Sequence, residues 1–266
     1  MTGDMYWKFV RFGDEVIAGG SDSDTLQGFT VGTDSAFAAV SGAPAARQLA
    51  VIRDFVVTGN VSYSGGTHRS RVRWSSINDA TSWTIGTNQA DFQDIPDAGQ
   101  ITGLVGGEYG VVLLEKAIAR MQYVGSPLIF TFEKVETNHG CNYPNSVASL
   151  GASQVFYLAD DGFFMFNGQK SIPIGAEKVD QFFFDDLDFD NSDRITCTID
   201  PENQCVMWGY PSINGVGNPD RIIVYNYAVQ KWSIVELDHE LLSSSLTPSF
   251  SLEALDNISS TLEGLT

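Results

Sequence analysis

Basic residues are scarce in this sequence, and their scarcity argues against one large class of function. The chain of 266 residues has 15 Lys and Arg against 33 Asp and Glu, which gives a net charge of −18. Because such an acidic surface repels phosphate groups at long range, the composition argues against an ordinary DNA- or RNA-binding domain.

Long hydrophobic runs are also missing. The longest apolar stretches, such as residues 111–114, are far too short to cross a bilayer, so no membrane span is expected. The first ten residues lack a basic segment followed by an apolar one, and no signal peptide is expected. With 43% apolar residues, the chain still has enough hydrophobic side chains for a substantial core.

Cysteine and histidine residues are too few and too scattered to suggest a disulfide framework or a metal site. The three cysteines cannot form a closed set of disulfides because their number is odd. Cys197 and Cys205 flank a turn at Asp200-Pro201, which would let them face each other across a hairpin, although reduced thiols that pack as small apolar residues are the favoured interpretation. No Cys-x-x-Cys occurs and the three histidines are dispersed, so no metal ligand is assigned.

The motifs that carry common enzyme chemistry are absent as well. The sequence has no P-loop, no Gly-x-Ser-x-Gly elbow, no His-Glu-x-x-His and no dinucleotide fingerprint. We therefore predict that the protein is not an enzyme, and we assign no catalytic, cofactor-binding or metal-binding residue.

Short strands separated by turn residues dominate what is present. The clearest example is residues 155–174, where VFYLA, FFMF and QKSIPI are separated by Asp160-Asp161-Gly162 and Asn167-Gly168. Asp-Gly and Asn-Gly readily supply the positive φ angles of tight hairpin turns. This stretch predicts a three-stranded meander.

Similar groups of three or four strands recur along the chain. Aromatic or large apolar residues stand late in successive groups, roughly 40 to 60 residues apart, close to the period of four-stranded propeller blades: Phe29, Trp83, Phe132, Ile174 and Trp232. We predict an all-β, β-propeller-like domain over residues 1–235, with four to five blades of short antiparallel strands, some of them incomplete. Trp7 would end a blade whose beginning is absent. A β-sandwich or two stacked β-domains is the alternative.

Two segments depart from this pattern. Val179, Phe182 and Phe183 recur at i, i+3 and i+4 within residues 176–187, which predicts one short helix. Residues 236–266 form an acidic Ser/Leu-rich C-terminal tail. That tail either packs on its own ring or on a neighbouring subunit, or is disordered.

Residues 76–83, SINDATSW, form a degenerate Asp-box, the turn motif of sialidase-type propellers. Asn78 and Ala80 stand where the usual pattern has Asp and Gly. In such a turn a polar side chain binds the backbone while the Trp packs between blades, so the motif is structural. A glycosidase would also need a carboxylate pair or a Tyr nucleophile with its partner acid, and nothing in the sequence singles one out.

Two loops carry closely spaced carboxylates. Asp186, Asp188 and Asp190 alternate in the first, and Asn191 and Cys197 stand where a calcium loop requires Gly and Glu. A solvated acidic loop is therefore favoured over a cation site. The second loop receives the same interpretation and holds Asp22 and Asp24.

Three arginines alternate along one expected strand. Arg69, Arg71 and Arg73 would share one face, and Val72 and Trp74 would occupy the core face. The arginines would bind phosphate or the carboxylates of a partner subunit, and the net charge favours a subunit. An exposed edge strand protected by its charges is an equally good interpretation.

One long stretch resembles a known family. Residues 71–135, beginning RVRWSSINDATSWTIG, are similar to virion proteins of short-tailed phages and related prophages. The similarity continues through residues 160–180 (DDGFFMFNGQKSIPIGAEKVD), 200–211 (DPENQCVMWGYP) and 224–233 (VYNYAVQKWS), and includes the earlier pair RFGDEVIAGG and APAARQLAVIRDFVV. The family resembled is that of head-to-tail junction and tail-nozzle proteins.

The resemblance implies a structural role in the virion. Such proteins form a propeller-like platform in a homo-oligomeric ring, often a hexamer, that contacts the portal, adaptor and tail fibre proteins. The ring extends the DNA channel and helps retain or release the genome, and its subunits are made in the host cytoplasm. A carboxylate-lined lumen would let DNA slide without sequence-specific binding.

Two other functions remain open from the residues alone. The first is a carbohydrate-active or glycan-binding β-propeller, and the second is a general interaction scaffold. In every case four tryptophans are expected to pack between blades and not to form a ligand cage: Trp74, Trp83, Trp208 and Trp232.

Overall fold

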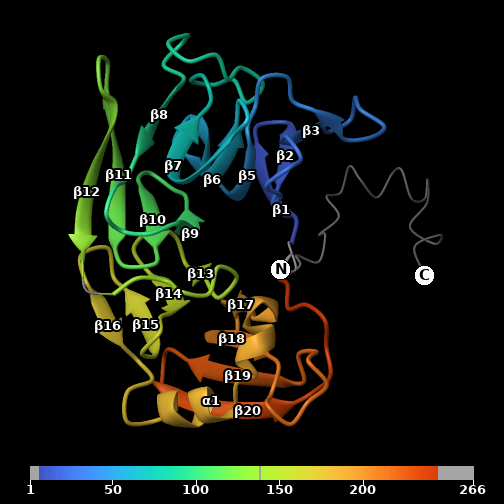
Figure 1. Ribbon diagram of the computed structural model, residues 1–266, viewed down its shortest axis with the longest axis vertical. Helices are drawn as coiled ribbons and strands as arrows, with labels where there is room; N and C mark the ends of the chain where they lie inside the picture. Colours follow the sequence, from blue (N-terminus) through green and yellow to red (C-terminus); the bar gives the residue numbers. More distant parts are fainter. Residues whose placement is uncertain (1–5, 138, 245–266) are drawn as a thin grey trace, which may run out of the picture.

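The computed structural model describes residues 6–137 and 139–244, and it arranges their strands in five four-stranded antiparallel sheets (Figure 1). Blade 1 contains β1 (Lys8–Phe12), β2 (Glu15–Gly19), β3 (Gln27–Thr30) and β4 (Ala38–Ala39). Blade 2 contains β5 (Ala45–Ile52), β6 (Phe55–Tyr63), β7 (Gly66–Trp74) and β8 (Asp91–Asp94). Blade 3 contains β9 (Ile101–Val105), β10 (Gly110–Leu114), β11 (Ile118–Gly125) and β12 (Ile129–Glu136).

The remaining two blades follow in chain order. Blade 4 contains β13 (Ala148–Ser149), β14 (Val155–Leu158), β15 (Phe163–Phe166) and β16 (Ser171–Pro173). Blade 5 contains β17 (Thr196–Asp200), β18 (Cys205–Tyr210), β19 (Arg221–Asn226) and β20 (Lys231–Glu236). Between them lie the helix α1 (Asp180–Asp186) and the 3₁₀ helix η1 (Phe189–Arg194). No helix in the described part of the chain is long and apolar enough to cross a membrane.

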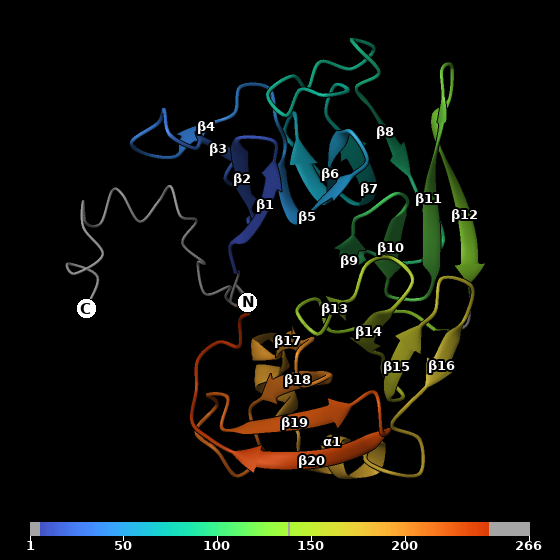
Figure 2. The ribbon, with the colours of Figure 1, turned by 180° about the vertical axis from the view of Figure 1, so that it is seen from behind.

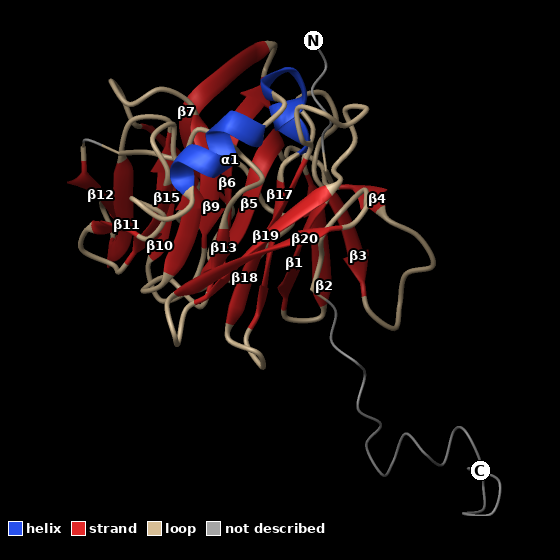
Figure 3. Cartoon of the chain, turned by 90° about the horizontal axis from the view of Figure 1, so that it is seen from below, coloured by secondary structure: helices blue, strands red, loops and turns tan. Residues whose placement is uncertain are grey.

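The five sheets stand around a common centre, which confirms the predicted β-propeller and rules out the sandwich alternative (Figures 1 and 2). The first strand of each blade lies innermost, and contacts between blades include β1 with β5, β5 with β9 and β13 with β17. The helix α1, drawn in blue in Figure 3, contributes Phe183 to the apolar cluster of residues from blades 4 and 5. Each blade is a meander of consecutive strands, so its hydrogen bonding is local in the sequence.

The hairpin chemistry read from the sequence is confirmed in blade 4. β14 and β15 pair from Val155–Phe166 to Leu158–Phe163, and β15 pairs in turn with β16. Gly162 has φ +148° in the first turn and Gly168 has φ +89° in the second. Side chains other than glycine rarely adopt such angles.

Apolar clusters hold neighbouring blades together. Among the buried residues that the structure describes, one cluster joins each of four blade pairs: blades 1 and 2, 2 and 3, 3 and 4, and 4 and 5. No such cluster joins blade 5 to blade 1 in this part of the chain. We call the region between these two blades the seam. It is visible in Figure 1 between β1 and the sheet of β17–β20.

The expectation of incomplete blades is wrong, because each of the five sheets has four strands. Trp7 does not end a blade. It directly precedes β1, the first strand of blade 1. The assignment failed because an isolated aromatic residue near a terminus does not reveal on which side its blade lies.

The predicted helix forms but is shorter than residues 176–187 and buries fewer side chains. It spans Asp180–Asp186, with Phe183 fully buried and Phe182 exposed, while Val179 is buried at its N-cap position. Seven residues make barely two turns, so only a narrow stripe of the helix contacts the sheets.

The two cysteines beside the Asp-Pro turn do not face each other. β17 and β18 pair Cys197 with Trp208, and they pair Cys205 with Asp200. All three cysteines are free. The turn between the strands, and not symmetric spacing, sets the register and therefore separates the two thiols.

The end of the propeller domain, predicted at residue 235, lies one residue before the end of β20. Beyond it, the amides of Leu237 and His239 donate to the carbonyls of Asp220 and Pro219 at 2.9 and 3.0 Å. Residues 237–244 thus lie along blade 5, and the predicted tail otherwise falls on residues 245–266, outside the described residues.

Candidate functional site

The arginines of β7 share one face, as predicted, but two of them are held by their own blade or its neighbour. Arg71 donates to both carboxylate oxygens of Asp94 at 2.7 and 2.8 Å and stacks 3.9 Å from the Phe92 ring centre. Arg69 donates to Gln100 at 3.2 Å. The Arg71 guanidinium holds the pKa of the Asp94 carboxyl below its ordinary value.

Arg73 lies inside the blade, with 2% of its surface exposed. It donates to the carbonyls of Trp83 and Gly42 at 2.6 and 3.3 Å and stacks 3.8 Å from the Tyr63 ring centre. Burial lowers the pKa of its guanidinium. The three arginines therefore do not form an anion-binding row.

The edge-strand interpretation of this segment is also wrong. β7 pairs with β6 on one side and with β8 on the other. The opposite face of β7 is core, as predicted, because Val72 and Trp74 are buried.

The Asp-box segment forms a structural turn in the connection between β7 and β8. The Ser76 hydroxyl lies 2.9 Å from that of Ser82, and Asp79 accepts from the amide and hydroxyl of Thr81 at 2.9 and 2.7 Å. Trp83 is buried in the apolar cluster that joins blades 1 and 2. The motif thus fixes the packing of two blades.

The other tryptophans also occupy contacts between blades. Trp74 lies in the cluster joining blades 2 and 3. Trp208 is fully buried in the cluster joining blades 4 and 5, and Trp232 packs partly buried against it.

Two of the three carboxylates of the acidic loop at 186–191, those of Asp186 and Asp188, have partners within the chain. Asp186 accepts from the Tyr210 hydroxyl at 3.0 Å and pairs with Arg221 at 3.3 Å. Asp188 accepts from the Asn191 amide at 2.7 Å and caps η1. Among the described residues, no cluster of metal-ligating side chains is formed.

The other acidic loop is tied down in the same way. Arg47 donates through Nε to Asp22 at 2.7 Å, and Ser21 donates to Asp24 at 3.0 Å. These carboxylates stabilise local structure.

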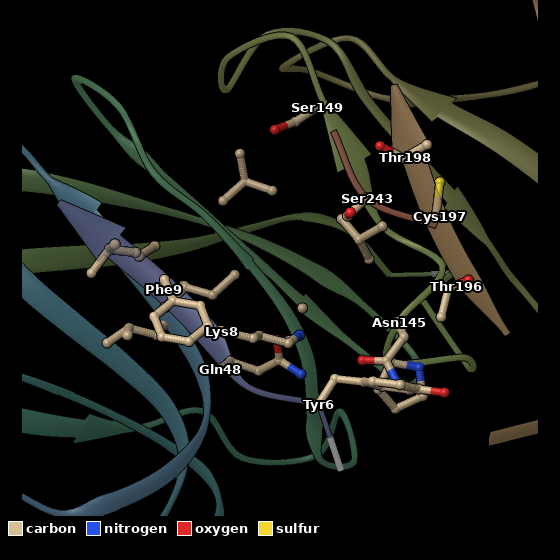
Figure 4. A pocket seen from close by; sticks show the side chains of 18 of the residues that line it. Tyr6, Lys8, Phe9, Gln48, Asn145, Ser149, Thr196, Cys197, Thr198 and Ser243 are labelled. Carbon is tan, nitrogen blue, oxygen red and sulfur yellow. Dashed lines mark hydrogen bonds between the residues drawn. The ribbon is translucent and has the colours of Figure 1, made fainter. Parts of the chain in front are cut away.

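A cavity that no sequence motif indicated lies at the centre of the propeller. It has a volume of about 710 Å³ and is lined by residues of the innermost strands together with residues 241–244 (Figure 4). Its polar lining comes mainly from six side chains: Lys8, Gln48, Asn145, Ser149, Thr196 and Thr198. A cavity of this size matches those that hold small molecules.

Lys8 and Gln48 form the most defined contact in this channel. The Lys8 ammonium donates to Oε1 of Gln48 at 2.6 Å, and Nε2 of Gln48 donates to the carbonyl of Thr102 at 2.8 Å. The surrounding walls lower the pKa of Lys8 to about 8 through desolvation, and the Cys141 thiol opposes this in part. Lys8 is half-buried by surface area, because its ammonium opens onto the channel.

A second cavity, of about 1030 Å³, lies in the seam and includes Tyr6, Arg194 and His239 in its lining. Nδ1 of His239 lies 2.8 Å from the carbonyl of Leu237. The ring packs directly against the Cα of Gly209 in β18, where a Cβ would collide with Nε2. This contact fastens residues 237–244 to blade 5.

Sequence reasoning missed the channel because its residues belong to no local pattern. Lys8 and Gln48 are separated by 40 residues, and each looks like an ordinary polar residue in a strand. Only the closure of the blades around a centre brings them together.

No protein-family model and no curated protein matches this sequence. Among solved structures, the dihydro-heme d1 dehydrogenase NirN in complex with DHE superposes with a TM-score of 0.51 at 12% identity, over 88% of this chain and 46% of that one. The extracellular domain of the hybrid two-component system BT4673 from B. thetaiotaomicron superposes with a TM-score of 0.53 at 12% identity, over 87% and 27%. AztD from Citrobacter koseri gives 0.42 at 13% identity, over 88% and 71%.

This chain therefore spans less than half of the NirN chain and about a quarter of the BT4673 extracellular domain. At such low identity, the likeness establishes the β-propeller fold alone.

Proposed function

We propose that this chain is a structural, non-enzymatic subunit of a short-tailed phage particle. It acts in the tail nozzle or head-to-tail junction, where copies of the chain assemble into a ring around the path of the DNA. The sequence resemblance supplies the family. The observation that carries the assembly role is an exposed aromatic patch on blade 1.

The patch, called the blade 1 patch, contains Trp7, Phe9, Phe29 and Phe37. Trp7, Phe9 and Phe37 are 54, 58 and 44% exposed. The Phe37 ring lies 6.1 Å from that of Phe9 and 5.3 Å from that of Phe29. The three phenylalanines form aromatic surface of the kind that is typical of protein–protein contacts, and Trp7 and Phe9 also border the central cavity.

Blade 5 also exposes separate apolar side chains. Ile213 and Val216 lie in the β18–β19 connection, and Ile234 and Val235 lie on β20, the edge strand of the blade. The blade 1 patch and these side chains belong to different surfaces of the same molecule. Contact between two different surfaces of identical subunits is heterologous, and such contacts generate rings when the rotation closes. A second copy of this chain is therefore the partner that we propose for the blade 1 patch.

The charge distribution supports passage of DNA without adhesion. The net charge is −18, and the row of arginines on β7 makes its hydrogen bonds to groups of the same chain. An acidic surface lowers the affinity for phosphates. DNA would slide past such a ring and not bind to it.

Imaging of the purified chain by negative-stain electron microscopy tests the proposal. We expect ring-shaped class averages with a hole of duplex width, and we expect the double variant Phe9→Ser/Phe37→Ser to give single propellers. Phe182→Ser, which changes an exposed phenylalanine on α1, is the matched control and should still form rings. Circular dichroism confirms that each variant is folded.

Single propellers of the wild-type chain at every concentration would overturn the assembly role. Binding of such particles to a glycan would instead favour the carbohydrate-binding alternative.

A further inference from the structure

The central channel contains one cationic side chain that has no acidic partner among the described residues. Lys8 is the only formally charged side chain among the residues that line this cavity. Within the described residues, no carboxylate lies within 4.0 Å of its ammonium, although the chain has 33 acidic residues. A partly desolvated charge without a counter-ion is unfavourable. A negatively charged ligand would therefore stabilise Lys8 at this position.

The ammonium is oriented by a fixed neighbour. Gln48 is buried, with its amide nitrogen held by the carbonyl of Thr102 and its oxygen turned to Lys8. An ammonium has three N–H donors, and Gln48 accepts one of them. The other two N–H groups are available to a molecule in the channel.

The rest of the channel offers both polar and apolar contacts. Asn145 and Thr198 line the cavity, and their side chains make no hydrogen bond to any described residue. Val10, Leu104 and Val147 supply apolar surface. Figure 4 places Lys8 and Gln48 on one wall and Asn145, Thr196 and Thr198 on another.

We infer that the central channel binds a small monocarboxylate with an apolar body, and that Lys8 pairs with its carboxylate. One ammonium balances one carboxylate charge, whereas phosphate sites usually combine an arginine fork or several backbone N–H groups. The apolar walls accommodate the hydrocarbon part of the ligand, and Asn145 supplies further N–H donors. The cavity volume fits a molecule of this class.

Titration calorimetry of the full chain with hexanoate tests this inference, with hexanamide as the neutral analogue. We expect hexanoate to bind and hexanamide to bind at least about tenfold more weakly, since a charge-assisted hydrogen bond is lost. Lys8→Met should weaken hexanoate by a similar factor, and Lys8→Arg should retain most of the binding. Lys170→Met, which removes an exposed lysine in the β15–β16 turn, is the matched control.

Three results would overturn the inference: no binding of hexanoate, equal binding of hexanamide, or unchanged binding by Lys8→Met. Inorganic phosphate is titrated in parallel. Binding of phosphate without binding of hexanoate would show that the channel binds phosphate and not a monocarboxylate. Thermal unfolding shows whether each variant is folded. Hexanoate binding is compared only among the wild type and the lysine variants, which leave the blade 1 patch unchanged, because Phe9 of that patch also lines the central cavity.

Discussion

Arg73 and Lys8 are both cations inside the propeller, but the lost hydration of their charged groups is compensated in different ways. Arg73 is almost fully buried and donates to backbone carbonyls of Trp83 and Gly42. Lys8 has one neutral partner, Gln48, and faces a cavity. The first arrangement ties two segments of the chain to β7, whereas the second leaves donors for a ligand.

Replacement of Arg73 tests its structural role. Arg73→Ala should lower the free energy of unfolding by about 2–4 kcal/mol, because it leaves the Trp83 carbonyl without a donor and opens a cavity beside Tyr63. Urea unfolding measures the change. Arg11→Ala, at an exposed arginine whose Nε donates to the Gly13 carbonyl, should change it by less than about 0.5 kcal/mol. Equal stability of Arg73→Ala and wild type would refute the role.

Lys8 should make stability depend on pH in a definite direction. Its pKa is about 8 in the folded chain and 10.5 as the ordinary value. Between these pH values the unfolded state binds more protons, so the contribution of Lys8 to stability rises with pH. Burial raises the pKa of Cys197, which also lines the channel.

We therefore expect Lys8→Met to be more stable than wild type near pH 7, with a gap that narrows as the pH rises toward 10. Urea unfolding at several pH values measures the gap. A constant gap across this range would show that the ammonium is fully solvated in the folded protein.

At the scale of elements, blade 5 depends on the segment that follows its last strand. Residues 237–244 lie along the face of this blade at the seam, held by the backbone hydrogen bonds of Leu237 and His239 and by the amide of Leu242, which donates to Thr196 at 3.3 Å. The His239 ring covers Gly209. The segment thus covers strand surface that no neighbouring blade covers.

Gly209→Ala should detach this segment from blade 5. The added methyl group would occupy the position of the His239 ring, so the ring must leave its place against β18. We expect faster hydrogen exchange at the amides of Leu237 and His239 and little change within β10. The double variant Gly209→Ala/His239→Ala lacks the collision between the methyl group and the ring. We expect its amides at positions 237 and 239 to exchange more slowly than those of Gly209→Ala. Unchanged exchange in Gly209→Ala would disprove the contact.

At the scale of the whole molecule, apolar clusters of the described residues close four of the five boundaries between blades, and no cluster of these residues closes the seam. The net charge of −18 makes copies of the chain repel each other, while in the proposed ring the blade 1 patch would favour their contact. Assembly of the proposed ring would depend on the balance between these two effects.

Salt should shift that balance toward assembly. Raising NaCl from about 0.05 M to about 0.5 M shortens the Debye length and screens the repulsion, but leaves the apolar contact in place. We expect a larger sedimentation coefficient for wild type at high salt and no change for Phe9→Ser/Phe37→Ser. A smaller coefficient at high salt would mean that ion pairs, and not the patch, join the copies.

The sequence predicted those parts of the architecture, its turns and strands, that depend on residues close together in the chain. The turns at Gly162 and Gly168 and the alternating strands of residues 155–174 follow from hairpin chemistry within a few residues. Burial of Trp83 was also predictable, because its turn motif is local. The resemblance to phage tail proteins is the basis of the function that we propose.

The tertiary structure alone decided which residues meet across blades. The fate of Arg73, the separation of Cys197 from Cys205 and the completeness of blade 1 depend on strand register and on partners distant in the sequence. The pairing of Lys8 with Gln48 in the channel is of the same kind. Turn and strand preferences act over a few residues, whereas a channel and a seam arise only when whole blades pack around a centre.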